Sequence, residues 1–262
     1  MRSFRNSKDA RRLSRNFFLI TNEDGEDILL SEKLGIAMRI RRGGYIPKSG
    51  LLMAEQLSKL KIRGKVLDIG TGETGILANC LLALGASHVL ASDIDPQAIQ
   101  WAQQASNMSL KISWINCDLF PDNLTDGAFN TIVSNPPQMP MPYQGHPHDY
   151  GGADGRSFIS RIVKNGKRLL CRDGKLILLC FDFLGIEHVF GQTTIIDLAQ
   201  THGLRTKIIA RHRRIIRKGG KTEENISWIE TICPGYSFQR DTQGNYYHEV
   251  LILEMSHDLI SS

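Results

Sequence analysis

Short apolar runs alternate with segments of helical periodicity along the chain from Lys65 onward. The runs have the length of single buried strands, and the segments between them repeat their apolar positions at the spacing of a helix. The helix expected after the second run begins with Pro96, a residue that favours the first turn of a helix. The pattern predicts strands at 65–69, 88–92, 112–116, 130–134, 175–181, 204–210 and 248–254, and helices at 75–84, 96–106, 156–170 and 191–202.

This alternation of strands and helices predicts an α/β fold. Consecutive strands joined by helices form a parallel sheet that helices cover on both faces. The segment from Arg211 to Asn245 separates the last two expected strands and is predicted to be a loop excursion. We therefore expect a sandwich around a mostly parallel sheet of seven strands, in which the last strand is antiparallel.

Residues 1–50 follow a different pattern from the rest of the chain. Apolar runs at 17–21 and 27–30 flank Asn22-Glu23-Asp24-Gly25, a sequence typical of the tight turn between two antiparallel strands. We expect a small amino-terminal extension with a β-hairpin over residues 1–50 and a main domain over residues 51–262.

Composition and charge narrow the setting of the protein. The chain of 262 residues carries a net charge of +5, which favours an acidic partner such as RNA without establishing one. Its longest apolar stretches fall far short of the roughly 20 residues that cross a membrane. The five cysteines are scattered without metal spacing, and the start of the chain does not resemble a secretory signal. These features predict a cytoplasmic protein without a membrane association and leave the oligomeric state open.

A glycine-rich loop follows the first strand of the expected main domain, with the sequence Asp68-Ile69-Gly70-Thr71-Gly72-Glu73-Thr74-Gly75. Gly70 and Gly72 let the backbone turn sharply and approach a ligand that any Cβ would obstruct. Ligands of open α/β sheets bind beyond the carboxyl ends of the strands, so this loop is the expected ligand site. The carboxylate of Asp68 would attract a cationic ligand group and repel a pyrophosphate.

Two further acids follow the next two strands. A carboxylate at Asp93 can accept hydrogen bonds from both hydroxyls of a ribose. Asp118 can accept from an adenine amine, while Leu119 or Phe120 packs near the ring. Taken singly, each acid is also explained as a helix cap or a loop carboxylate. Three acids at three successive strand ends instead favour a nucleoside site.

Four segments resemble one family in consecutive motif order. VLDIGTGETG (66–75), ASDIDPQAI (91–99), CDLF (117–120) and SNPP (134–137) resemble the class I S-adenosylmethionine-dependent methyltransferases, which have a Rossmann-like seven-stranded sandwich fold. The segment at 134–138 is similar to the Asn-Pro-Pro-aromatic signature of enzymes that methylate planar nitrogens. GGADGRSFI (151–159) is similar to the segment that follows this signature in protein-glutamine N-methyltransferases of the release-factor type.

The resemblance implies S-adenosylmethionine as the cofactor of an enzyme that needs no metal. His146 and His148 also lack a third ligand at matching spacing, so no metal site is expected. The residues assigned to cofactor binding are Asp68, Gly70, Thr71, Gly72, Gly75, Asp93, Ile94, Asp118, Leu119 and Asn135. Asn135, Pro136, Pro137 and Gln138 are assigned to catalysis, and Ser134, Gln138 and Tyr143 to contacts with the methyl acceptor.

The chemistry of methyl transfer accounts for the Asn-Pro-Pro segment. The methyl group on a sulfonium sulfur is already reactive, so the enzyme mainly orients the nucleophile and excludes water. An amide nitrogen is a poor nucleophile because its lone pair is delocalised. Asn135 and the carbonyl of Ser134 or Pro136 can accept hydrogen bonds from the amine and turn its lone pair towards the methyl group. The prolines stiffen these carbonyls and offer no competing donor.

Three departures from the family pattern bear on the acceptor. Gln138 stands where the family usually has an aromatic ring that stacks on a planar substrate, which favours a polar, hydrogen-bonded acceptor. Thr74 stands where a third glycine is usual. Residues 1–50 are too short and too strand-like for the helical amino-terminal domain of release-factor methyltransferases. The expected acceptor is therefore an amide or amine nitrogen of a polar substrate, either glutamine-like in a protein or a small molecule.

Two alternatives remain open from the sequence. The segment Arg205–Lys221 is strongly basic and contains no acid, so it is either a solvated face or a phosphate-binding rim. The second possibility would suit methylation of an adenine amine in RNA. A non-catalytic binding subunit of the same fold is the other alternative, although such a protein would not need to keep Asp68, Asp93 and Asn135.

Overall fold

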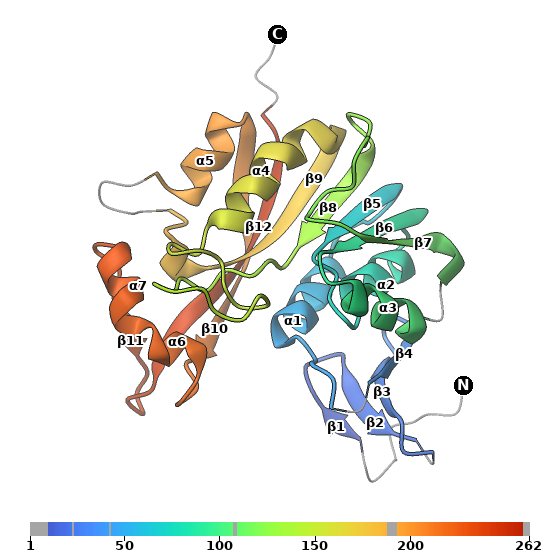
Figure 1. The fold of residues 1–262 in the computed structure, drawn as a ribbon, viewed down its shortest axis with the longest axis horizontal. Helices are drawn as coiled ribbons and strands as arrows, with labels where there is room; N and C mark the ends of the chain where they lie inside the picture. The colour runs from blue at the N-terminus through green and yellow to red at the C-terminus, as the bar shows by residue number, and fades with distance from the viewer. Residues whose placement is uncertain (1–9, 23, 42, 107–108, 188–192, 259–262) are drawn as a thin grey trace. The chain divides into compact units, whose positions relative to one another are not determined.

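The computed structural model describes residues 10–22, 24–41, 43–106, 109–187 and 193–258. The chain divides into two compact units, residues 1–134 and 135–262 (Figure 1). No helix within the described residues is both long enough and apolar enough to cross a membrane.

The first unit contains a small antiparallel sheet and a larger parallel one. Its elements are β1 (Arg11–Arg12), β2 (Phe18–Thr21), β3 (Asp27–Ser31), β4 (Ile36–Ile40), α1 (Lys48–Leu57), β5 (Lys65–Ile69), α2 (Ile76–Ala83), β6 (His88–Asp93), α3 (Pro96–Ala105), the 3-10 turn η2 (Ser109–Lys111), β7 (Ile112–Asn116) and β8 (Phe129–Ser134).

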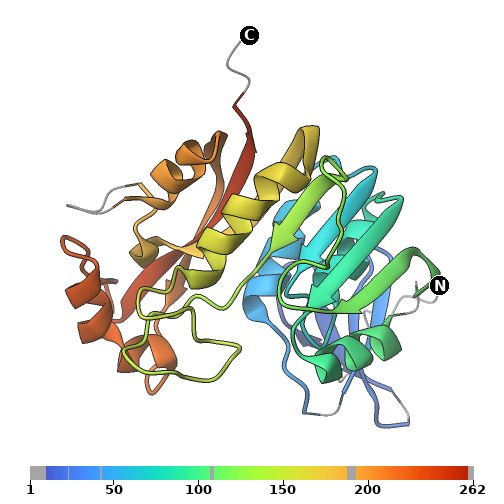
Figure 2. The ribbon, with the colours of Figure 1, turned by 45° about the horizontal axis from the view of Figure 1, so that its top comes forward.

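The parallel strands of the first unit run in the order β8-β5-β6-β7. Ile69 at the end of β5 lies opposite both Ser92 of β6 and Ser134 of β8, so the carboxyl ends of these three strands are level. Helices α2 and α3 pack against strands β5 to β7, and α1 packs against α2 (Figure 2). Four of the five residues of β5 are buried, as expected for a strand covered on both faces.

The amino-terminal residues form the four-stranded antiparallel sheet β1-β2-β3-β4. Strands β2 and β3 make the predicted hairpin, which Gly25 closes by donating to the carbonyl of Asn22 at 3.0 Å. Strand β4, which was not predicted, alternates buried and exposed residues and packs against α2 and α3. The boundary expected between residues 50 and 51 falls inside α1.

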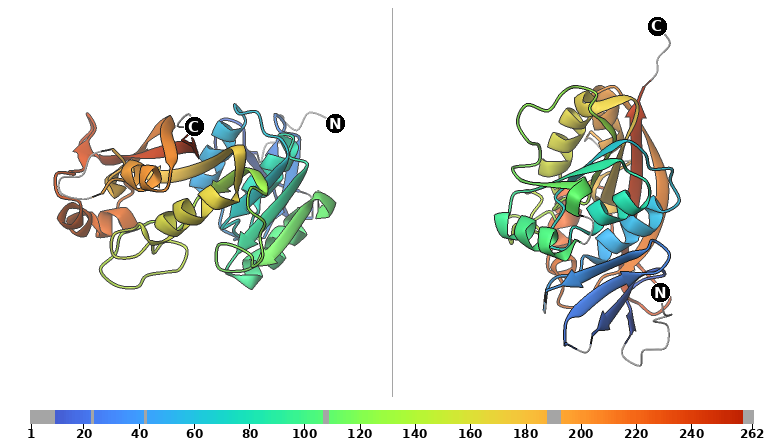
Figure 3. Two further views of the ribbon diagram at one scale, coloured as in Figure 1. Left: turned by 90° about the horizontal axis from the view of Figure 1, so that it is seen from above. Right: turned by 90° about the vertical axis from the view of Figure 1, so that its right-hand side faces the viewer.

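The second unit is built on three long strands in the order β10-β12-β9, in which β12 runs antiparallel to both β10 and β9. Strands β10 and β12 pair along nearly their whole length (Figure 3). Helix α4 packs against β9, α5 packs against β10, and the two helices contact each other. The elements of this unit are α4 (Ser157–Leu169), β9 (Leu170–Phe181), the 3-10 turn η3 (Asp182–Leu184), α5 (Ile195–Thr201), β10 (Leu204–Ile215), α6 (Lys221–Glu224), α7 (Ile226–Ile232), β11 (Gln239–Arg240) and β12 (Tyr246–His257).

The α/β class is confirmed, with a parallel set of strands in the first unit and an antiparallel last strand, β12. The expectation of a loop excursion over 211–245 is wrong in part. Strand β10 continues to Ile215, because β12 pairs with it along this length and its basic residues lie on a partly exposed strand. The elements α6, α7 and β11 follow it. Of the helix expected at 191–202, residues 191 and 192 lie outside the described residues, and α5 begins at Ile195.

Candidate active site

Asp68 is the penultimate residue of β5 and is fully buried. The hydroxyl of Thr71 donates to its Oδ2 at 2.7 Å, whereas its Oδ1 makes no hydrogen bond of ordinary geometry with the described residues, and the backbone amide of Ala78 only slightly lowers the pKa of the carboxyl. Burial raises the pKa of this carboxyl from 3.8 to about 7, against the opposing effect of the Thr71 hydrogen bond. A buried carboxylate oxygen without a partner is a costly arrangement that a cationic ligand group would relieve.

The glycine loop is held in shape by the end of β6. The amides of Gly70 and Thr71 both donate to the carbonyl of Ser92 at 2.9 Å, and the amide of Gly72 donates to Oδ2 of Asp93 at 2.8 Å. Gly70 and Gly72 have φ angles of 72° and 65°, and a Cβ added at either would meet nothing within 4 Å. The loop therefore leaves open space beside its backbone, where a ligand can approach closely.

Gly75 ends the same loop but has a structural role in packing. It is the N-cap of α2, with a φ of 56°, and a Cβ there would lie 2.6 Å from the ring of Trp114. Its amide donates to the carbonyl of Gly72 at 3.2 Å. The structure thus gives Gly75 a packing role between α2 and β7, which the assignment to cofactor binding did not include.

The carboxylate of Asp93 already binds two backbone amides, those of Gly72 and, at 3.0 Å, Asp95. Each carboxylate oxygen has two acceptor sites, so both can still receive a hydroxyl donor. The next residue, Ile94, is 64% exposed. An exposed isoleucine beside a half-buried carboxylate provides an apolar surface next to a polar anchor.

The loop after β7 is tied to the same strand end. Cys117 donates its amide to the carbonyl of Asp93 at 2.9 Å, and Ser92 donates its hydroxyl to the carbonyl of Leu119 at 2.8 Å. Leu119 has a φ of 64°, an uncommon conformation for a residue with a side chain. Asp118 is exposed, so its carboxylate faces solvent.

Asn135 to Gln138 begin the second unit and follow directly from Ser134, whose hydroxyl donates to the carbonyl of Ile69 at 2.9 Å. Asn135 is half-buried. The side chain of Gln138 is buried and fully engaged: Nε2 donates to the carbonyls of Pro136 at 3.2 Å and Leu179 at 3.0 Å. Its Oε1 accepts from the amide of Phe181 at 2.8 Å.

This arrangement corrects the expected role of Gln138. The side chain holds the Asn-Pro-Pro turn against the end of β9, and its amide is not available to contact an acceptor. The sequence indicated only that an aromatic ring was absent. Nothing in it indicated that the replacing amide bonds to backbone groups some forty residues later.

The loop that follows the turn returns alongside it. Met139 pairs with Asp149 and Gly151 through backbone hydrogen bonds of 2.8 and 3.0 Å. Between them Tyr143 is 61% exposed, and the exposed rings of His146 and His148 lie 4.9 Å apart. Among the described residues there is no group of three or more His, Cys, Asp or Glu side chains that could hold a metal ion.

A polar cluster at the end of β9 was not predicted. Asp182 accepts from the amide of Glu249 at 2.9 Å and from the hydroxyl of Tyr236 at 3.1 Å. Burial raises the pKa of Asp182 to about 6, and burial together with Arg214 lowers the pKa of the neighbouring His248 to about 4. These residues come from distant segments, so no local spacing could have indicated the cluster.

The basic segment Arg205–Lys221 is partly neutralised by its neighbours. Arg211 forms ion pairs with Glu187 at 2.6 Å and Glu249 at 3.1 Å. The guanidinium of Arg213 lies over the ring of Tyr247, 4.2 Å from its centre. At Arg211 the segment therefore presents less free positive charge than its sequence indicated.

Parallel strands whose tips carry carboxylates around a glycine loop are typical of α/β domains that bind nucleosides. The chain matches the family described as the methyltransferase small domain over residues 45–205, and it belongs to that family. The protein is therefore an S-adenosylmethionine-dependent methyltransferase.

Two curated relatives and one solved structure illustrate the similarity. A protein of Methanocaldococcus jannaschii, provisionally named a protein N5-glutamine methyltransferase, is 27% identical over 191 residues, which cover 70% of this chain and 92% of that protein. The release factor glutamine methyltransferase of Deinococcus radiodurans is 30% identical over 138 residues, which cover 48% of this chain and about half (49%) of the relative. The TYW2 protein of Pyrococcus horikoshii in complex with MeSAdo is similar in fold alone, with a TM-score of 0.51 and 14% identity over 90% of this chain and 73% of that one.

The residues of the first unit fit the chemistry of this cofactor. Asp68 provides a buried oxygen that no described residue hydrogen-bonds in ordinary geometry, which suits a cationic group, and Gly70 and Gly72 leave space where a Cβ would stand. Asp93 retains acceptor sites for hydroxyl groups. Ile94 offers exposed apolar surface beside it.

Proposed function

We propose that the enzyme methylates the side-chain amide nitrogen of a protein, of the glutamine type. The observation that carries this proposal is the Asn-Pro-Pro turn that leaves the carboxyl end of β8, held in place by the side chain of Gln138. Ser134, the residue before the turn, lies opposite Ile69, next to Asp68 in β5. A primary amide needs acceptors for its two N–H groups, and this turn supplies oxygen atoms on a stiff backbone.

S-adenosylmethionine supplies a methyl group on a positively charged sulfur. In the proposed mechanism Asp68 binds the cationic end of the cofactor, and Asp93 accepts from its ribose hydroxyls. Asn135 Oδ1 and the carbonyl of Pro136 accept from the two N–H groups of the substrate amide, which directs the nitrogen lone pair. The bound cofactor would supply the methyl group to this nitrogen, with its sulfur–carbon bond broken as the nitrogen–carbon bond is made, and the nitrogen would give up one proton to solvent.

Two observations support an amide over a nucleobase. Position 138 is a glutamine and so offers no ring on which a base could stack. Its side chain is buried and hydrogen-bonded to backbone groups of β9. In the basic segment, Arg211 is paired with two acids and Arg213 lies on Tyr247. The names of two relatives also refer to glutamine methylation, which supports the same acceptor chemistry.

The test is to incubate the purified protein with cofactor that carries a tritiated methyl group and with a fractionated cell lysate. We expect label in the protein fraction, resistant to ribonuclease, and N-methylglutamine after proteolysis and mass spectrometry. The Asn135→Ala variant serves as the control for background transfer. Label confined to RNA or to small molecules would contradict the proposed acceptor while leaving the methyltransferase family unaffected.

A further inference from the structure

The carboxylate of Glu73, in the middle of the glycine loop, is held from outside that loop. The backbone amide of Tyr45 donates a short hydrogen bond to its Oε1, and Arg41 Nη2 lies 3.4 Å from its Oε2. Arg41 and Tyr45 belong to the segment that leaves β4. The amino-terminal extension therefore makes direct contact with the loop between Gly72 and Thr74.

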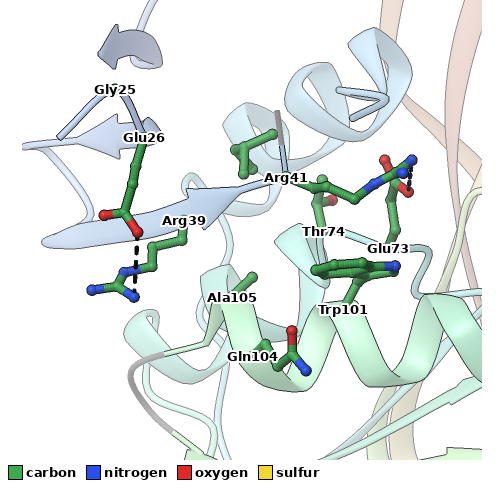
Figure 4. A pocket seen from close by; sticks show the side chains of 10 residues that line it. Gly25, Glu26, Arg39, Arg41, Glu73, Thr74, Trp101, Gln104 and Ala105 are labelled. Carbon is green, nitrogen blue, oxygen red and sulfur yellow. Dashed lines mark hydrogen bonds and ion pairs between the residues drawn. The ribbon is translucent and has the colours of Figure 1, made fainter. Parts of the chain in front are cut away.

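These contacts lie at a cavity of about 370 Å³ in the first unit (Figure 4). The guanidinium of Arg41 is 5.5 Å from the ring centre of Trp101 on α3 and also reaches Glu73, so three elements meet around this one cation. Gly44 permits the approach, because a Cβ there would lie 2.7 Å from the carbonyl of Arg41 and 3.0 Å from Glu73 Oε1. The close fit indicates that the segment is shaped around the carboxylate.

We propose that Glu73 is a positioning residue for cofactor binding, through which the amino-terminal extension holds the glycine loop in its binding conformation. Glycines lose more conformational freedom on ordering than other residues, so a loop with Gly70 and Gly72 costs free energy to fix. Any part of this cost met before the cofactor arrives increases affinity. The role goes beyond the proposed acceptor and gives the extension a function in the enzyme.

The other hydrogen bonds of the glycine loop indicate which part of the loop depends on Glu73. Gly70, Thr71 and Gly72 are each bonded to the end of β6, which fixes the first half of the loop. Glu73 ties the following position to a different segment, the one after β4. Its side chain is 23% exposed and that of Arg41 48%, so the pair is partly shielded from solvent rather than fully screened.

The same cavity provides a matched control. Arg39 and Glu26 form a second ion pair, 3.5 Å apart, on the amino-terminal sheet. Their side chains are 72% and 41% exposed, and within the described part of the chain neither forms an ion pair with the glycine loop. Glu26→Gln removes the same charge from the same cavity without touching an anchor of the loop.

The experiment measures the affinity of purified variants for S-adenosylmethionine and for S-adenosylhomocysteine by calorimetry. We expect Glu73→Gln to weaken both roughly five- to tenfold and Glu73→Ala to weaken them more, because glutamine can still accept from Tyr45. Glu26→Gln should stay within about twofold of the wild type. Arg41→Gln combined with Glu73→Gln should be no weaker than the poorer single variant, since both remove one interaction.

Hydrogen exchange of the cofactor-free protein gives a second readout. Amides 70–74 should exchange faster in Glu73→Gln than in the wild type or Glu26→Gln, while β5 and β6 remain protected. Unchanged cofactor affinity in Glu73→Gln, or effects of Arg41 and Glu73 that simply add, would overturn the proposal. Because calorimetry requires no acceptor, this outcome is separate from any failure of the proposed function.

Discussion

The side-chain amide of Gln138 behaves as one more peptide unit at the edge of β9, where it accepts from the amide of Phe181 at 2.8 Å and donates to the carbonyl of Leu179 at 3.0 Å. The other edge of these residues pairs with β12. A third hydrogen bond reaches the carbonyl of Pro136, so one side chain joins the Asn-Pro-Pro turn to the strand. The position of the turn thus depends on a residue that does not need to touch the acceptor.

Gln138→Ala should destabilise the protein by about 2–4 kcal/mol, because it leaves buried backbone groups of β9 without partners. It should also lower kcat with little effect on the affinity for the cofactor, since the turn loses its support. Urea unfolding and cofactor titration measure the two effects. Gln144→Ala, at an exposed glutamine of the following loop, is the matched control. Equal stability of the two variants would contradict the role assigned to Gln138.

Asn135→Ala should reduce kcat by about 10²- to 10³-fold, the cost of losing one oriented hydrogen-bonding group at the reacting atom. The affinity for S-adenosylmethionine should change by no more than about twofold, because the carboxylates proposed to bind the cofactor, Asp68 and Asp93, are unchanged in this variant. Single-turnover kinetics with the labelled acceptor and calorimetry test the two parts. Near-normal turnover in the variant would remove Asn135 from the mechanism.

Asp68→Asn should stabilise the cofactor-free protein at pH 8 more than at pH 5. The folded-state pKa is about 7 and the reference value is 3.8, so on raising the pH the unfolded chain releases this proton first. The stability of the wild type therefore falls by a total on the order of 4 kcal/mol as the pH rises from 3.8 to about 7, and it is constant above that pH. Asparagine avoids this loss and can still accept from Thr71.

Denaturant unfolding at both pH values measures this effect, with Asp118→Asn at an exposed carboxylate as the control. If the increase in the free energy of unfolding caused by Asp68→Asn does not grow with pH, Asp68 is not held as a neutral acid. The same variant should lose cofactor affinity, because it lacks the charge that the cationic group requires.

Two glycines of one loop should respond differently to alanine. Gly75→Ala places a Cβ 2.6 Å from Trp114 at a positive φ and should cost about 2–4 kcal/mol of stability. Gly70→Ala meets no atom within 4 Å and should cost only about 1 kcal/mol, the strain of the φ angle. Cofactor affinity should fall in Gly70→Ala, where the methyl group enters the open space. Thermal unfolding and calorimetry separate the two cases, and a reversed order of stability would contradict this assignment.

The sequence predicted the parallel strands of the first unit closely, because β5 to β8 are short apolar runs that no exposed charge interrupts. Observed and expected limits agree for β5 and β7, and β6 and β8 each extend by one residue. The acids at the strand ends were also predictable, since topology alone brings the ends of parallel strands to one edge.

Other features depend on contacts that a linear pattern does not contain. The basic residues of β10 indicate a solvent-exposed segment when only the sequence is considered. In the structure the backbone of β12 pairs with β10, and Glu249 of β12 forms an ion pair with Arg211. Strand β4 is short, and its buried positions depend on α2 and α3. The burial of Gln138 and the packing of Gly75 on Trp114 likewise follow from tertiary neighbours rather than from residue type.

The carboxylates proposed for the cofactor all precede residue 135, and the turn and loop proposed for the acceptor begin with it. One stretch of the gene would then encode recognition of the methyl donor and the next stretch would encode the choice of recipient. Grafting the later stretch from another member of the family should then redirect methylation to a new target while the nucleoside site stays unchanged.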